Sequence, residues 1–216
     1  MATASESPLL TRSSFGRLYP IVDVPVASEL SRALALVDAL VELRLPWLQL
    51  RCKAAPGAAH VAAARAVVTR ARRGCTRIVV NDRLDVAAIA GADGVHLGQN
   101  DLPLAAARGA ARRPIVLGVS THSVEEARAA AAAGADYIGY GPMFATASKR
   151  DALATRSMAE LRAVRAAVSL PIVAIGGITE ATAGEVLAAG ADAVAMIGAL
   201  AAAPDPGALV KRLLAL

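Results

Sequence analysis

The feature that most constrains the fold is a regular alternation between short apolar runs and alanine-rich stretches. The apolar runs are expected to be strands, and they occur eight times, at Leu18–Asp23, Trp47–Lys53, Arg77–Asp82, Gly94–Gly98, Ile115–Ser120, Tyr137–Gly141, Ile172–Gly176 and Ala193–Ile197. In the stretches between them apolar residues recur every three or four positions, which predicts helices. The clearest of these are Leu30–Leu43, Ala58–Arg72, Val124–Ala133, Thr179–Ala189 and Ala208–Leu214.

Eight strand and helix units, with strands apolar enough to be buried on both faces, predict an α/β fold that closes into a (β/α)8 TIM barrel. A doubly wound open sheet is the competing architecture, and a Gly-x-Gly-x-x-Gly fingerprint after the first strand would favour it. That fingerprint is absent there. We therefore expect a single catalytic domain over residues 17–216, preceded by a flexible N-terminal tail over residues 1–16 that lacks the features of a secretory signal.

The tripeptide Gly-Ala-Asp follows three of the expected helices and leads into the next strand each time, at residues 91–93, 134–136 and 190–192. Internal duplication is one interpretation of this repeat. The other, which we favour, is that a glycine ends each helix and a short turn follows it.

Composition limits the classes of protein that this chain can belong to. Although 56% of the residues are hydrophobic, no apolar run approaches the roughly 20 residues of a membrane span, so no membrane partner is expected. The only two cysteines, Cys52 and Cys75, are too few for a disulfide framework and lack zinc-site spacing. This cysteine usage favours the reducing cytoplasm.

The chain is basic, with 23 Lys and Arg residues against 18 acidic ones and a pI near 9.8. A nucleic-acid partner would rest mainly on the arginines at positions 70, 72, 73 and 77. Because aromatic residues are scarce and the arginines are dispersed over several helix ends, we expect a solvated basic surface and no nucleic-acid partner. The sequence does not fix the oligomeric state, and a homo-oligomer is compatible with it.

The second expected strand carries polar residues in alternation with apolar ones. A period of two places Gln49, Arg51 and Lys53 on one face, and Leu50 and Cys52 on the other. If the polar face points into the barrel, it needs a polar ligand to offset the cost of desolvation. The alternative is a strand end that frays into solvent with two exposed cations.

Two carboxylates follow successive strands, since Asp82 ends the third strand and Asp101 follows the fourth. Neighbouring parallel strands bring their carboxyl ends to one edge, so both acids can close on one cation. Mg²⁺ commonly takes one or two carboxylates and completes its shell with phosphate oxygens and water. The alternative is that both acids are structural salt-bridge partners of Arg51, Lys53 and Lys149.

Three loops have the composition of an anion site. The loop after the sixth strand, residues 141–149, is rich in small hydroxyl residues ahead of a lysine. Glycines follow the seventh and eighth strands, at Gly176, Gly177 and Gly198. Backbone N–H groups at such positions can face a phosphate, and loops seven and eight form the usual phosphate site of the barrel. Tight strand-to-helix turns would also require glycine.

Taken in order, seven segments resemble the motifs of the thiamin phosphate synthase family. They are residues 18–23, 49–53, 81–86, 96–103, 118–122, 141–149 and 174–178. The resemblance implies a (β/α)8 barrel that joins hydroxymethylpyrimidine diphosphate to a thiazole phosphate with Mg²⁺ and releases pyrophosphate. The reaction would be a dissociative displacement, because the attacking thiazole nitrogen has a free lone pair and the difficulty lies in the leaving group.

The resemblance also implies roles for individual residues. The pyrimidine diphosphate would be held by Gln49, Arg51, Lys53, Asn81, Ser120 and Lys149, of which Arg51, Lys53, Ser120 and Lys149 are the expected catalytic residues. Asp82 and Asp101 would bind Mg²⁺. The thiazole phosphate site would be lined by Thr146, Ala147, Ser148, Gly177, Ile197 and Gly198.

Three positions depart from the family pattern. Cys52 replaces a common Glu but is expected to face away from the ligand, and Ser148 replaces a common Thr and keeps the hydroxyl. Gly198 replaces a common Ser. It keeps the backbone N–H and loses a side-chain contact to phosphate, so the affinity for thiazole phosphate is the property most affected.

Two other functions are compatible with parts of this set. A thiazole tautomerase of the same barrel family would move a proton, for which His122 is a candidate. A noncatalytic phosphate-ligand sensor would keep the glycine loops and lose the carboxylate pair. The diphosphate and metal residues favour the synthase over both. His96 is expected to be a strand residue whose ring is satisfied by its neighbours.

Overall fold

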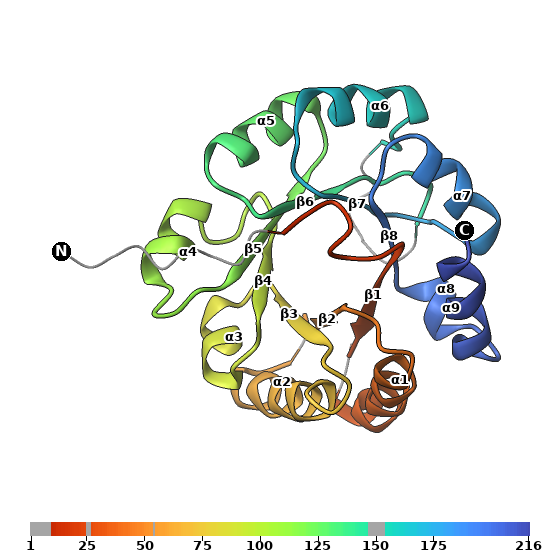
Figure 1. Ribbon diagram of the computed structural model, residues 1–216. Helices are drawn as coiled ribbons and strands as arrows, with labels where there is room; N and C mark the ends of the chain where they lie inside the picture. Colours follow the sequence, from red (N-terminus) through yellow and green to blue (C-terminus); the bar gives the residue numbers. More distant parts are fainter. Residues whose placement is uncertain (1–9, 25–26, 54, 147–153) are drawn as a thin grey trace.

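The computed structural model describes residues 10–24, 27–53, 55–146 and 154–216. Its strands form a closed parallel barrel in chain order, which confirms the predicted (β/α)8 fold (Figure 1). The strands are β1 (Leu18–Asp23), β2 (Trp47–Arg51), β3 (Arg77–Asn81), β4 (Gly94–Leu97), β5 (Val116–Thr121), β6 (Tyr137–Tyr140), β7 (Ile172–Ala174) and β8 (Ala193–Met196). Most strands end one or two residues before the predicted position, where the backbone leaves the ladder for a loop.

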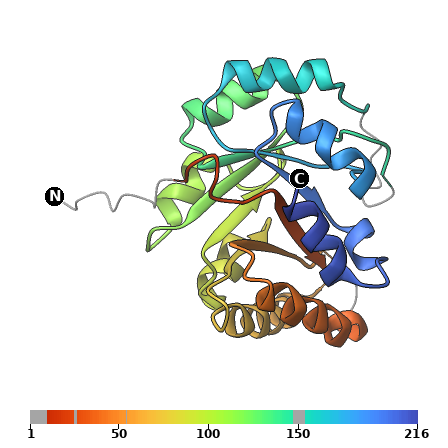
Figure 2. The ribbon, with the colours of Figure 1, turned by 45° about the vertical axis from the view of Figure 1, so that its right-hand side comes forward.

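Helices surround the barrel on the outside (Figures 1 and 2). They are η1 (Ala27–Glu29), α1 (Leu30–Glu42), α2 (Gly57–Ala71), α3 (Leu84–Ala90), α4 (Leu104–Ala110), α5 (Val124–Ala132), α6 (Met158–Ala167), α7 (Glu180–Ala188), α8 (Gly198–Ala201) and α9 (Pro206–Leu214). Local signals start several of them: at α6, Ser157 and Glu160 form a capping box, and at α9 the Asp205 side chain accepts a hydrogen bond from the Ala208 N–H.

The strand residues separate into two apolar layers. Alternate side chains such as Leu18 and Val22 point outward and pack under the helices, whereas Tyr19 and Ile21 point into the barrel. The ladder closes where Leu18 pairs with Val194 of β8. Parallel pairing throughout places the carboxyl ends of all eight strands at one end of the barrel. None of the helices in the described part of the chain combines the length and hydrophobicity that a membrane span requires.

The Gly-Ala-Asp repeat has a structural explanation. The three glycines have left-handed backbones, with φ values of 72°, 84° and 113° at Gly91, Gly134 and Gly190. Each aspartate that follows then accepts a hydrogen bond from a backbone N–H of the preceding strand, at 2.7–2.9 Å. The repeat therefore ends a helix and fastens the start of one strand to the next, as the turn interpretation predicts.

The segment before β1 differs from the predicted flexible tail. Phe15 is fully buried, and its ring centroid lies 4.8–5.4 Å from those of Tyr19, Trp47 and Tyr137. The segment crosses the centre of the barrel at the amino ends of the strands (Figure 1, dark red). Arg12 adds an ion pair to Asp192 at 2.6 Å. The expectation of a tail up to residue 16 is therefore wrong for this part, because an aromatic side chain fills the barrel floor.

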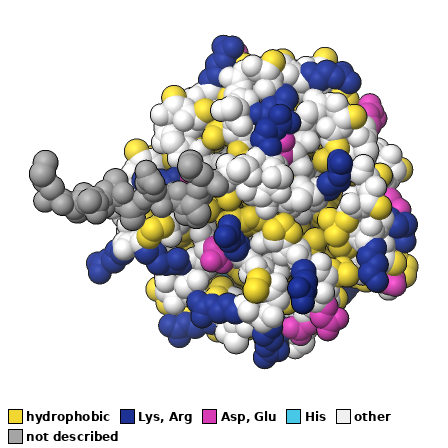
Figure 3. Space-filling model, in the orientation of Figure 1, with side chains coloured by type: hydrophobic (Ala, Val, Ile, Leu, Met, Phe, Trp, Pro, Cys, Tyr) yellow, Lys and Arg dark blue, Asp and Glu magenta, His cyan; other side chains and the backbone are white. Residues whose placement is uncertain are grey.

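Basic side chains are scattered over the molecular surface. On the face shown in Figure 3, Lys and Arg are spread among other residues and gather in no single stripe. Several arginines are occupied by acids or by backbone carbonyl groups; for example, Arg108 contacts Asp136 at 2.8 Å and also donates to the Ile115 carbonyl oxygen. This distribution agrees with the solvated basic surface that the composition predicts.

Candidate active site

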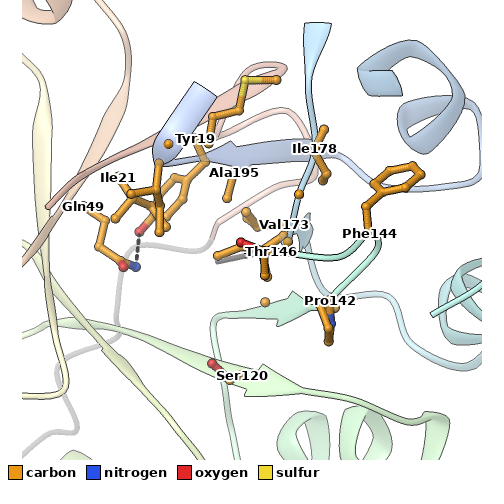
Figure 4. A pocket seen from close by; sticks show the side chains of 18 of the residues that line it. Tyr19, Ile21, Gln49, Ser120, Pro142, Phe144, Thr146, Val173, Ile178 and Ala195 are labelled. Atoms are coloured by element: carbon orange, nitrogen blue, oxygen red, sulfur yellow. Dashed lines mark hydrogen bonds between the residues drawn. The ribbon is translucent and has the colours of Figure 1, made fainter. Parts of the chain in front are cut away.

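A cavity of about 630 Å³ opens at the carboxyl ends of the strands, and every strand of the barrel contributes to its wall (Figure 4). Its interior is mainly apolar, with Ile21, Val173 and Ala195 among the lining side chains. Polar groups come chiefly from β2, β3, β4 and β5, and glycine-rich turns from β7 and β8. The cavity can thus bury an apolar ring between polar groups on opposite sides.

The face assignment for β2 is confirmed for Gln49 and Arg51, whereas Lys53 follows the end of the strand and does not line the cavity. Gln49 and Arg51 line the cavity, and the Gln49 amide donates to the Tyr19 hydroxyl at 3.4 Å (Figure 4). Cys52 is buried in the outer core together with Leu50. Burial raises the pKa of the Cys52 thiol to about 12, as expected for a side chain that faces the helices.

Arg51 is held by a residue for which the sequence gives no role. Its Nη1 atom donates to Oδ2 of Asp23 at 2.7 Å, and the two residues are register partners on β1 and β2. The other carboxylate oxygen of Asp23 is buried without a hydrogen-bond partner among the described residues. Asp23 therefore fixes the direction of the Arg51 guanidinium at the cavity wall.

The two predicted metal ligands lie together. Burial raises the pKa of Asp82, and a hydrogen bond to Asp101 raises it further, whereas nearby Lys53 lowers it. The Lys53 ammonium lies 3.3 Å from Asp82, so one of the ion pairs proposed as a structural alternative is present. Asp101 also accepts a hydrogen bond from the Gly98 N–H at 2.7 Å.

This carboxylate pair fits a cation with a partly open coordination shell. Two adjacent carboxylates disfavour simultaneous ionisation unless positive charge neutralises them, and burial and Asp101 raise the pKa of Asp82 in this way. Within the described residues no group of three His, Cys, Asp or Glu side chains could hold a metal. Mg²⁺ needs fewer protein ligands than that, since phosphate oxygens and water complete its shell.

A row of polar side chains crosses the barrel interior and lines the cavity. The Tyr19 and Tyr137 hydroxyls are 3.0 Å apart, and Tyr137 contacts His96 Nδ1 at 2.9 Å. On the other side of the ring, His96 Nε2 lies 2.9 Å from Ser120 Oγ. The prediction of a satisfied His96 ring is thus confirmed. No role was predicted for the two tyrosines, although Tyr19 lies in the segment 18–23 that resembles a family motif and both residues have inward positions on strands.

The glycine turns lie on the opposite side of the same cavity, where Thr146, Gly177, Ile197 and Gly198 contribute to the lining. Gly177 has φ 62°, and an added Cβ would lie 2.4 Å from the Ala145 carbonyl oxygen, so a side chain cannot be accommodated there. Gly198 is the first residue of α8 and has open space around it. The predicted residues Ala147, Ser148 and Lys149 lie outside the described residues.

Two more predicted residues reach the wall of this cavity. Asn81 ends β3 and lines it. His122 also lines it, but its Nδ1 atom is 2.9 Å from the Glu126 carboxylate, which in addition accepts the His122 backbone N–H. The His122 ring is therefore tied to the start of α5.

Comparison with known proteins gives a consistent result. Residues 18–200 match the family model of thiamine monophosphate synthase. A thiamine-phosphate synthase of Chloroflexus aurantiacus is 42% identical over 200 residues, covering 93% of this chain and 92% of the relative, and one of Methanospirillum hungatei is 47% identical over 165 residues, covering 76% and 80%. The solved thiamine phosphate pyrophosphorylase of Pyrococcus furiosus superimposes with a TM-score of 0.82 at 32% identity, covering 93% and 94% of the two chains. The chain therefore belongs to the thiamine monophosphate synthase family.

Proposed function

We propose that the protein is a transferase that joins hydroxymethylpyrimidine diphosphate to a thiazole phosphate, giving thiamin phosphate and pyrophosphate. The observation that carries the proposal is that one cavity has Arg51 and Asn81 in its wall on one side and glycine turns on the other. Lys53, Asp82 and Asp101 lie together just beyond the carboxyl ends of β2, β3 and β4, next to the first side. The first side suits a diphosphate with a metal, and the second suits a single phosphate. Relatives that cover most of the chain are named thiamine-phosphate synthase.

The reaction requires little general acid or base catalysis by the protein. The attacking thiazole nitrogen carries no proton, so no general base is required. Negative charge gathers instead on the departing pyrophosphate, and groups fixed in advance near that charge lower the barrier. We assign this role to Arg51, Lys53 and Lys149, and the contact with Asp23 that orients Arg51 supports the assignment of that residue. Gln49, Asn81 and Ser120 would then bind and orient the pyrimidine diphosphate.

We assign Asp82 and Asp101 to a Mg²⁺ ion. When bound, this ion would supply positive charge to the diphosphate oxygens. Lys53 would neutralise part of the acid pair and remain within reach of the leaving group. On the other side of the cavity, we assign Thr146, Ala147, Ser148, Gly177, Ile197 and Gly198 to the thiazole phosphate. We also propose a cytoplasmic location, since both cysteines are free.

A thiazole tautomerase is less well supported. His122, the candidate for proton transfer, is held by Glu126, and a tautomerase has no use for the acid pair beside Lys53. A noncatalytic sensor would not need that pair either.

The test is to incubate purified protein with both substrates and follow thiamin phosphate and pyrophosphate together. We expect equimolar products that require both substrates and Mg²⁺. Isomerisation of the thiazole phosphate without pyrophosphate release would identify a tautomerase. Binding of the substrates without turnover would identify a sensor, and equal turnover in excess chelator would remove the metal assignment.

A further inference from the structure

The row of hydrogen bonds from Tyr19 to Ser120 lines the cavity and contains more polar groups than packing of a barrel interior requires. Tyr19 and Tyr137 are buried, with 1% and 0% of their surface exposed, and burial raises the pKa of both phenols. Each phenol therefore remains protonated and brings one hydrogen to the row. Buried hydroxyls of this kind are costly unless they are paired, so the pairing is specific.

Neighbouring strands leave space for these side chains. A Cβ added at Gly118 of β5 would lie 2.1 Å from Cζ of Tyr137. A Cβ added at Gly139 of β6 would lie 3.0 Å from Cε1 of His96. Two glycines in strand interiors, where glycine is unfavourable, thus accommodate the tyrosine and the histidine.

The number of hydrogens determines which group is the donor in each hydrogen bond of the row, and we call this order the direction of the row. The Gln49 amide donates to the Tyr19 oxygen, so it offers no acceptor for the Tyr19 hydrogen. Among the described residues the Tyr137 oxygen is the acceptor within reach of this buried hydrogen, and a reversed order would leave the hydrogen unpaired, so the Tyr19 hydroxyl donates to Tyr137. The Tyr137 hydrogen then goes to His96 Nδ1, which must accept it. The ring proton consequently lies on Nε2 and is donated to the Ser120 oxygen.

The Ser120 hydroxyl hydrogen is the one hydrogen that this order does not use, and Ser120 lines the cavity (Figure 4). The Gln99 amide holds the same residue by its backbone carbonyl oxygen at 2.6 Å. The Ser120 side chain and backbone are thus both held, and in this order its hydroxyl hydrogen is left available to the cavity.

We propose that Tyr19, Tyr137 and His96 are positioning residues that keep Ser120 a hydrogen-bond donor toward an acceptor atom of the pyrimidine diphosphate. The identity of that ligand rests on the proposed function, but the direction of the row does not. A reversed row would make Ser120 donate to His96 and present only lone pairs to the cavity, which would disfavour an acceptor.

The first experiment determines the direction of the row from the tautomer of His96 and needs no substrate. Long-range ¹⁵N–¹H NMR on labelled protein at neutral pH distinguishes the two imidazole tautomers, and the chain has three histidines, so His96→Gln identifies the signal. We expect a neutral ring protonated on Nε2. In Tyr137→Phe the Nδ1 donor is lost, and the signal should shift toward a mixture of tautomers. A wild-type ring that carries its proton on Nδ1, alone or with Nε2, would overturn the proposal.

The second experiment asks whether the row acts through Ser120. Tyr137→Phe should raise the Michaelis constant for the pyrimidine diphosphate by about tenfold, and that for the thiazole phosphate by less than about twofold. In a Ser120→Ala background the same change should have little further effect, because the group that it positions is gone. Additive losses, or equal losses for both substrates, would show a merely structural role.

Tyr140→Phe is the matched control, because it removes a phenol from the same strand on the face that packs under the helices. It should leave the tautomer and both constants unchanged. If Tyr137→Phe does not fold, Tyr19→Phe takes its place, because it removes the hydroxyl that donates to Tyr137. The His96 tautomer and the two Michaelis constants are then measured as for Tyr137→Phe. Should the protein make no thiamin phosphate at all, the tautomer measurement still decides the direction.

Discussion

Arg51 and Asp23 occupy opposite positions on β1 and β2 and share a hydrogen bond of 2.7 Å at the rim of the cavity. This contact orients a cation that we assign to the diphosphate. A charged hydrogen bond contributes about 1.5–3 kcal/mol, so Asp23→Ala should lower kcat/KM by about 10- to 100-fold. Steady-state kinetics on the folded variant checks the value.

Asp23→Asn is the informative control for this contact. It keeps an oxygen that can accept from Arg51 and removes the charge, so it should recover most of the activity that alanine loses. If both variants retain wild-type kcat/KM, Asp23 has no positioning role and Arg51 reaches the diphosphate unaided.

The acid pair is best tested with asparagine. Asp82 has a left-handed backbone with φ 65°, which asparagine tolerates and alanine disfavours, and asparagine at 101 keeps an acceptor for the Gly98 N–H. Asp82→Asn and Asp101→Asn should each lose most activity and stay folded. Mg²⁺ binding measured by calorimetry in the presence of the pyrimidine diphosphate should weaken in both.

The raised pKa of Asp82 also predicts how Asp82→Asn changes the stability of the protein with pH. A carboxyl whose folded pKa lies above its unfolded value disfavours folding once the pH exceeds both. Asp82→Asn should therefore raise the melting temperature of the metal-free protein at pH 8, and the gain should shrink as the pH falls through the folded pKa toward the unfolded one. A lower melting temperature at pH 8 would indicate that Asp82 is mainly a structural partner of Lys53.

Gly198→Ser is predicted to improve the binding of the thiazole phosphate. Its φ lies outside the left-handed region, and an added Cβ meets nothing within 4 Å, so serine fits without strain. If the thiazole phosphate lies at the start of α8, Gly198→Ser adds a hydrogen bond to an anion, worth about 1.5–3 kcal/mol. The Michaelis constant for thiazole phosphate should fall by about one to two orders of magnitude, with the pyrimidine constant unchanged.

Gly109→Ser in α4 is a matched control, because its added side chain also meets nothing and the residue lies away from the cavity. It should change neither constant. A shift in the pyrimidine constant of Gly198→Ser, or no shift in a folded variant, would move the phosphate site toward residues 146–149.

The two cysteines should differ in reactivity. With its pKa raised to about 12, Cys52 has almost no thiolate at pH 8, whereas Cys75 is exposed. A disulfide reagent should therefore titrate one thiol in the native protein and two after denaturation. Cys52→Ser should destabilise the fold by about 1–3 kcal/mol and leave both Michaelis constants near wild type. Rapid modification of Cys52 in native protein would mean that its face of β2 is accessible.

Periodicity and spacing were enough to predict the barrel, the inward face of β2 and the pairing of Asp82 with Asp101. These features depend on backbone geometry that repeats along the chain, so they can be deduced from the order of residues. The link between Asp23 and Arg51 and the row from Tyr19 to Ser120 depend on which side chains meet across a closed barrel. That information comes from register, which the residues of a single strand do not specify.

Phe15 has a consequence for the order of events during turnover. Within the described residues it fills the floor of the barrel, so we expect substrates to enter and products to leave at the carboxyl ends of the strands. We therefore expect the substrate that binds in the deeper part to arrive first, and the product that lies nearer the rim to leave first. A closed floor thus predicts ordered addition of the two substrates and ordered release of the two products.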